Sequence, residues 1–174
     1  QSSFWSISRI FPTNSAGNYF AAGNESGNIY IWRADQIIEG SSDCRPLAAL
    51  IPDNEVEVIT SIQDLNTGAH LAAGDSQGNI MIWDYLSGSN IQNLSIHSSQ
   101  ITSMCLFGKE SLVAASYDGS LSFWEVKLKG SNSLEMIPIK NTKSNYYIYS
   151  VFCSKENPNV LYYSDSSKKV KMLD

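Results

Sequence analysis

Short apolar runs alternate with polar turns along the chain, and one such pattern occurs four times. In the clearest copy, residues 71–83 predict two short strands joined by a tight polar turn. Gly78 suits this turn because a residue without a Cβ readily adopts the positive φ that short hairpin loops need. Related hairpins are predicted at residues 20–32, 112–124 and 161–173, the last of which ends in leucine instead of tryptophan. The chain is therefore a series of related hairpins.

A further strand pattern precedes each hairpin, and a serine marks the same place in all four copies. These serines are Ser6, Ser61, Ser103 and Ser150. The hairpins end at residues 32, 83, 124 and 173, so the steps between them are 51, 41 and 49 residues. No segment shows the period of an amphipathic helix over three turns. We therefore predict an all-β chain built from repeated antiparallel sheets.

These repeats resemble WD40 repeats, in which about 40–45 residues form four strands and close on a Trp-Asp pair such as Trp83-Asp84. The resemblance covers essentially the whole chain, residues 1–174. It implies a β-propeller of WD40 type with about four four-stranded antiparallel blades, at about residues 1–51, 52–96, 97–140 and 141–174. The last blade is expected to lack its outer strand. We therefore expect part of a larger, seven-bladed ring, with a closed four-bladed ring as the alternative.

The resemblance also implies a buried hydrogen-bonded tetrad in the third blade. Its members are expected to be His97, Ser116, Asp118 and Trp124. Serine, histidine and aspartate also serve hydrolases, but no Gly-x-Ser-x-Gly elbow is present and the set belongs to a structural repeat, so we predict a structural role. The other blades have no histidine at this place, which makes the chain a divergent member. There, Asp75 and Asp165 are expected to accept backbone N–H bonds.

The closing position of each hairpin predicts an apolar anchor. Trp32, Trp83 and Leu173 share the register of Trp124, and the tryptophans are expected to be largely buried between neighbouring blades. Trp5 lies outside this register.

Charge and composition argue against several classes of function. The net charge is −5 without a basic patch, so nucleic acid is not favoured as a partner. No apolar run approaches the roughly 20 residues that span a bilayer. With two histidines and no Cys-x-x-Cys, no metal site is expected, and without a glycine-rich phosphate loop no cofactor is expected. Three widely spaced cysteines favour a reducing compartment, cytoplasmic or nuclear.

The sequence therefore favours a non-catalytic protein–protein interaction scaffold within a larger assembly. Its partners are expected to be other proteins or peptides, together with the remaining propeller blades in cis or in trans. The predicted contact residues, all on loops at one rim, are Glu55, Gln77, Tyr117, Lys143 and Tyr146. Two alternatives remain open. The propeller regulates or positions a catalytic domain outside this chain, or, less favoured, it is itself an enzyme.

Overall fold

The computed structural model describes residues 3–13, 17–35, 44–54, 56–130, 133–154 and 156–173 as four antiparallel sheets, or blades. Blade one contains β1 (Phe4–Ile10), β2 (Tyr19–Asn24), β3 (Ile29–Arg33) and β4 (Ala48–Leu50). Blade two contains β5 (Ile59–Asp64), β6 (His70–Asp75), β7 (Asn79–Asp84) and β8 (Ser89–Ser95). Blade three contains β9 (Ile101–Phe107), β10 (Ser111–Ser116), β11 (Ser120–Lys129) and β12 (Ser133–Lys143). Blade four contains β13 (Ile148–Cys153), β14 (Leu161–Asp165) and β15 (Val170–Leu173). The all-β prediction is confirmed.

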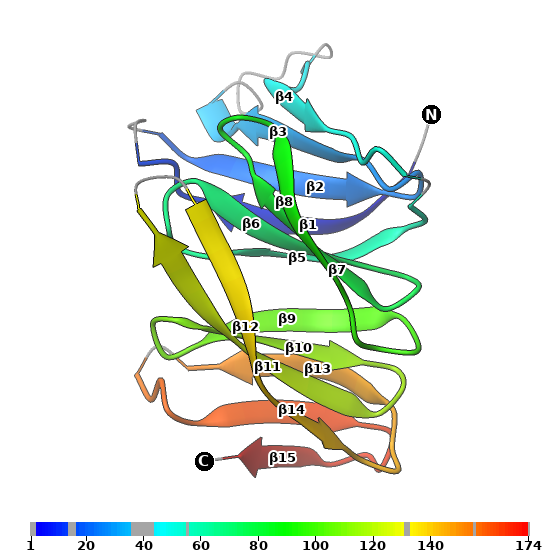
Figure 1. Ribbon diagram of the computed structural model, residues 1–174. Helices are drawn as coiled ribbons and strands as arrows, with labels where there is room; N and C mark the ends of the chain where they lie inside the picture. The colour runs from blue at the N-terminus through cyan, green and yellow to red at the C-terminus, as the bar shows by residue number, and fades with distance from the viewer. Residues whose placement is uncertain are drawn as a thin grey trace.

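The four blades lie face to face in a stack, in chain order (Figure 1). The first strands of successive blades, β1, β5, β9 and β13, lie next to one another. This is the arrangement of propeller blades around a central axis. Blade one and blade four lie at opposite ends of the stack (Figure 1), so the described chain does not form the closed four-bladed ring that was the alternative.

An apolar core fills each junction between blades. Between blades one and two, Ile29 and Leu50 pack with Leu71 and Trp83. Between blades two and three, residues such as Ile82 pack with Leu112 and Trp124. The third core joins blades three and four. Because side chains alternate along a strand, each blade in the middle of the stack contributes one face to each of two cores.

Two small contacts recur at the junctions. In the first contact, a hydroxyl group of a first strand donates a hydrogen bond to a carbonyl oxygen of the next blade. Ser6 donates to the Ile59 carbonyl oxygen at 3.0 Å, and Thr102 donates to the Ile148 carbonyl oxygen at 2.9 Å. Glycine near the end of a second strand makes room for isoleucine from the next blade. A Cβ added at Gly74 would lie 2.5 Å from Ile101 Cγ2, well inside van der Waals contact. The blades therefore approach closely where glycine faces isoleucine.

Replacing Gly74 with alanine is expected to lower the free energy of unfolding by about 1–3 kcal/mol, because the added methyl group overpacks this junction. Combining it with Ile101→Ala should give a smaller loss than the sum of the two single losses, since the cavity accepts the methyl group. Urea unfolding of the four proteins in this cycle measures the coupling. Strictly additive losses would show that Gly74 does not set the approach of blades two and three.

The tryptophan anchors are buried only where another blade covers them. Trp83 is 2% exposed and Trp124 is 5% exposed. Trp32 contradicts the prediction, because it is only half-buried. It stacks on Phe20, on the face of blade one opposite to blade two, where no described blade covers it. Leu173 is partly buried against the core of blades three and four.

Candidate functional site

The turns within the blades and the connections between them meet at one end of the stack, here called the turn end. It comprises the β2–β3, β6–β7, β10–β11 and β14–β15 turns with the chain entering β5, β9 and β13. The Tyr117 N–H donates to the Gln100 carbonyl oxygen at 3.0 Å, which ties the turn of blade three to the residue directly before β9. The Ser144 N–H donates to the Gly119 carbonyl oxygen at 2.8 Å, which ties the same turn to the connection into blade four. The β10–β11 turn is therefore held on both sides by backbone hydrogen bonds.

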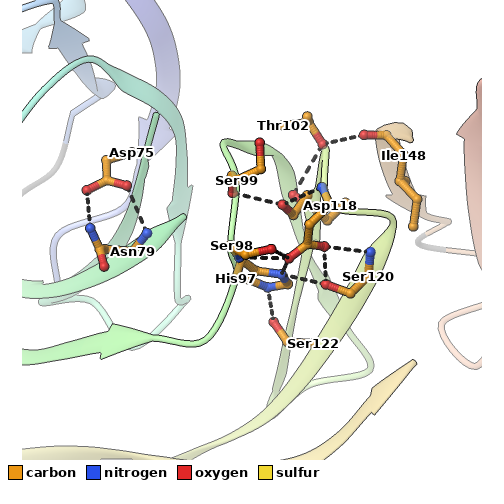
Figure 2. Close-up of polar contacts among 12 residues, drawn as sticks. Asp75, Asn79, His97, Ser98, Ser99, Thr102, Asp118, Ser120, Ser122 and Ile148 are labelled. Atoms are coloured by element: carbon orange, nitrogen blue, oxygen red, sulfur yellow. Dashed lines mark hydrogen bonds and ion pairs between the residues drawn. The ribbon is translucent and has the colours of Figure 1, made fainter. Parts of the chain in front are cut away.

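A buried polar network supports this end in blade three (Figure 2). His97 Nδ1 lies 2.8 Å from Ser120 Oγ, and His97 Nε2 lies 2.7 Å from Ser122 Oγ. The Trp124 indole N–H donates to Ser122 Oγ at 3.0 Å. Ser120 Oγ donates to Asp118, whose other carboxylate oxygen accepts the Ser98 N–H at 2.9 Å. The network therefore links the connection before β9, the β10–β11 turn and β11.

The serine of this network differs from the predicted one. Ser116 instead donates to the Ser99 carbonyl oxygen at 2.8 Å and accepts the Asp118 N–H at 3.1 Å. Ser122 lies between His97 and Trp124 because residues two apart on a strand share a face. Ser116 therefore braces the turn, while Ser120 and Ser122 carry the contacts to the histidine. His97, Asp118 and Trp124 lie in the network as expected.

One assignment of protons satisfies every contact of the His97 ring. Ser122 accepts from Trp124 and donates to His97 Nε2, so the proton of a neutral imidazole lies on Nδ1, facing Ser120. Burial lowers the pKa of His97, although the nearby Asp118 carboxylate opposes this shift. Burial also opposes ionisation of Asp118, but hydrogen bonds from Ser120 and the Ser98 N–H hold its pKa below the ordinary value. A neutral ring beside a carboxylate fits a structural brace.

The other blades use a side-chain oxygen to hold the same turn. Asp75 accepts the Gln77 N–H at 2.9 Å and the Asn79 N–H at 2.8 Å. Its second oxygen accepts from Asn79 Nδ2 (Figure 2). Asn24 and Asp165 also accept backbone N–H bonds in blades one and four. The expectation for Asp75 and Asp165 is confirmed.

Replacing Asp118 with alanine is expected to lower the free energy of unfolding by about 1–3 kcal/mol, since buried polar groups lose their partner. Gln77→Ala, at the corresponding place in blade two, should change it much less because Gln77 is exposed. Thermal and urea unfolding of both variants measure the difference. Equal losses would contradict the assigned network.

The predicted contact residues that the structure describes lie at the turn end. Gln77, Tyr117, Lys143 and Tyr146 are all exposed, and Lys171 Nζ lies 4.9 Å from the Tyr146 ring centroid. Glu55 lies outside the described residues. Two further tyrosines of the turn end, Tyr147 and Tyr149, were not among the predicted contact residues. The sequence feature that could have indicated them is the cluster of aromatic residues on either side of the buried Ile148.

Within the described ranges, no group of three or more histidine, cysteine, aspartate or glutamate side chains is arranged to hold a metal ion. Over the same part of the chain, no helix has the length and apolar character needed to cross a membrane.

Comparisons with known proteins agree with this architecture. The family model for the "WD domain, G-beta repeat" matches residues 88–125, from the outer edge of blade two to β11. Protein ROOT INITIATION DEFECTIVE 3 of Arabidopsis thaliana is 29% identical over 112 residues, which are 64% of this chain and 23% of that protein. The crystal structure of the WD40 beta propeller domain of Doa1 matches 99% of this chain and 51% of its own, with a TM-score of 0.74 and 16% identity.

The stacked sheets therefore define a segment of a β-propeller. The chain carries a WD40 repeat at residues 88–125 and is similar to WD40-repeat proteins, and it spans about half the length of the matched propeller structure and a smaller share of the plant relative.

Proposed function

We propose that this chain is a non-catalytic interaction scaffold within a larger assembly and that it binds other proteins through the turn end. The observation that carries the proposal is the bracing of exposed side chains by rigid sheets. Tyr117 is 38% exposed and Tyr146 is 46% exposed, while hydrogen bonds hold the backbone of the β10–β11 turn from both sides. Preorganised aromatic side chains lose little entropy on binding, which favours their use in interfaces.

The polar residues of blade three support a structural role better than a catalytic one. His97 is 7% exposed, and both of its ring nitrogens contact serine hydroxyls of the same blade. A general base must reach the proton that it takes from a substrate. These contacts direct the imidazole toward the protein interior.

The outer faces of the stack support a second class of partner, namely further propeller blades in cis or in trans. On blade one, Phe4, Ile7, Phe20 and Trp32 line an apolar groove of about 510 Å³. In blades two and three, the face with the equivalent Leu71–Trp83 and Leu112–Trp124 pairs packs on the preceding blade. The equivalent Phe20–Trp32 pair on blade one therefore favours a further blade packed on this face.

The thiols favour a cytoplasmic or nuclear location. Cys105 and Cys153 are free thiols, and burial, with a smaller effect from Cys153, raises the pKa of Cys105 to about 12. A thiol that stays protonated and partly buried is stable in a reducing compartment.

A photoreactive amino acid at position 117 is expected to cross-link a discrete protein partner in native cells, because this position lies on the turn end. The matched control is position 86, in the β7–β8 turn at the opposite end, where Leu86 is 49% exposed. Mass spectrometry of both samples identifies the cross-linked proteins. Equal labelling from position 86, or none from position 117, would contradict binding through the turn end.

A further inference from the structure

Three tyrosine rings from two blades meet at the turn end and define what we call the tyrosine pocket. Tyr117 belongs to the β10–β11 turn, Tyr147 directly precedes β13 and Tyr149 lies within it. The Tyr117 ring centroid lies 6.3 Å from that of Tyr147 and 5.9 Å from that of Tyr149, with interplanar angles of 79° and 89°. Together with Ser99, the rings line a pocket of about 370 Å³. The rings of Tyr147 and Tyr149 therefore stand nearly perpendicular to the ring of Tyr117.

The rings of this pocket are available to a ligand. Tyr147 is 62% exposed and Tyr149 is 48% exposed. Elsewhere, the chain uses aromatic faces to hold cations, as where Lys140 Nζ lies 4.7 Å from the Phe123 ring centroid and Lys171 Nζ lies 5.8 Å from that of Tyr163. Among the described residues, the cations of these contacts lie over rings outside the tyrosine pocket.

The residues that line the tyrosine pocket favour a quaternary ammonium group over a primary ammonium or a guanidinium group. A cation within about 6 Å of a ring centroid is attracted by the negative face of the ring, and quaternary ammonium groups are well suited because they bind water weakly. A primary ammonium is strongly hydrated, so it gains more from a carboxylate than from a ring. The described lining consists of tyrosine and serine, without a carboxylate. Walls at right angles also fit a rounded trimethylammonium group better than a flat guanidinium.

We propose that the tyrosine pocket binds a quaternary ammonium group, of the kind carried by a trimethylated lysine in a partner peptide. The net charge of −5 favours approach of such a cation. Asp118 follows Tyr117 directly in the β10–β11 turn, and its carboxylate accepts the N–H of Ser98, the neighbour of Ser99 in the pocket wall. This inference deepens the proposed function, on which it rests, by naming the chemistry that the turn end recognises.

Proton NMR with N-acetyl-trimethyllysine amide tests the proposal on the whole chain. Ring currents should shift the N-methyl resonance upfield as protein is added, and the dissociation constant follows from the titration. A neutral isostere with a tert-butyl carbon in place of the trimethylammonium should bind at least about fivefold more weakly. Tyr147→Leu should weaken binding of the cation by a similar factor. The matched control Phe152→Leu, in the β13 strand that follows Tyr147 and with 61% exposure, should leave it unchanged.

Equal binding of the isostere would overturn the proposal and show a merely apolar pocket. An absent upfield shift, or the same loss in Phe152→Leu as in Tyr147→Leu, would overturn it as well. Equal affinity for the unmethylated lysine amide would contradict the choice of a quaternary group. None of these results affects cross-linking from position 117, so a failure of this inference is distinguishable from a failure of the proposed function.

Discussion

Truncating Trp83 to alanine is expected to lower the free energy of unfolding by about 3–5 kcal/mol. The indole is 2% exposed and lies in the core between blades one and two. It pairs across the hairpin with Leu71, so its removal opens a cavity that rigid strands on both sides cannot close. Urea unfolding followed by circular dichroism measures the loss.

Two further variants make this result specific. Trp5→Ala should cost less than about 1 kcal/mol, because Trp5 is 64% exposed. Trp83→Phe should recover most of the loss, since it keeps a ring in the core and the Trp83 indole nitrogen has no hydrogen-bond partner among the described residues. If Trp83→Ala unfolds at the same urea concentration as the parent, Trp83 is not part of an inter-blade core.

The repeated hairpins were predictable because their signal is local. Alternation of apolar and polar residues sets which side chains of a strand share a face, and small polar turns set its ends. The register follows, so that Phe20 pairs with Trp32 and Leu71 with Trp83 in the structure. The same repeat also predicted the first strand of each blade.

Burial was less predictable, because it depends on neighbours that the local pattern does not encode. Trp32 and Trp83 occupy equivalent places, yet only Trp83 has a blade over it in the described structure. The serine of the polar network was missed for a different reason. Ser122 and Trp124 are two apart on one strand and so share a face, a relation that favours Ser122 over Ser116 once the strand is recognised.

The tyrosine pocket could not be predicted from the sequence, because it depends on how the blades pack on one another. Tyr117 was named from its turn, but its contact with Tyr147 and Tyr149 depends on how blade four lies against blade three. Nothing in the spacing of residues 117 and 149 sets that distance.

The two outer faces of the stack, on blades one and four, are apolar and exposed, and they lead to a prediction about self-association. Phe152, Tyr162 and Met172 lie side by side across blade four, because they pair across its strands. Their neighbours Val151 and Leu161 fill the core with blade three, so this row faces outward. Phe152 and Met172 are 61% and 60% exposed, and on blade one Ile7 is 70% exposed. Apolar sheet faces of this kind favour association.

We therefore expect the chain alone to self-associate and to become monomeric when blades are supplied in cis or in trans to cover these faces. Ile7→Glu and Met172→Glu, one on each outer face, should reduce association because each places a charge where an apolar contact is needed. Leu128→Glu is the matched control, since Leu128 is 52% exposed but belongs to β11 in blade three.

Size-exclusion chromatography with light scattering tests most directly whether these faces are inter-blade surfaces. If they are, the molar mass is expected to lie well above the 19.2 kDa of the chain and to rise with concentration. It should return toward that mass in Ile7→Glu and Met172→Glu but not in Leu128→Glu. A parent chain that stays monomeric and unfolds cooperatively at every concentration would show that these faces are not inter-blade surfaces.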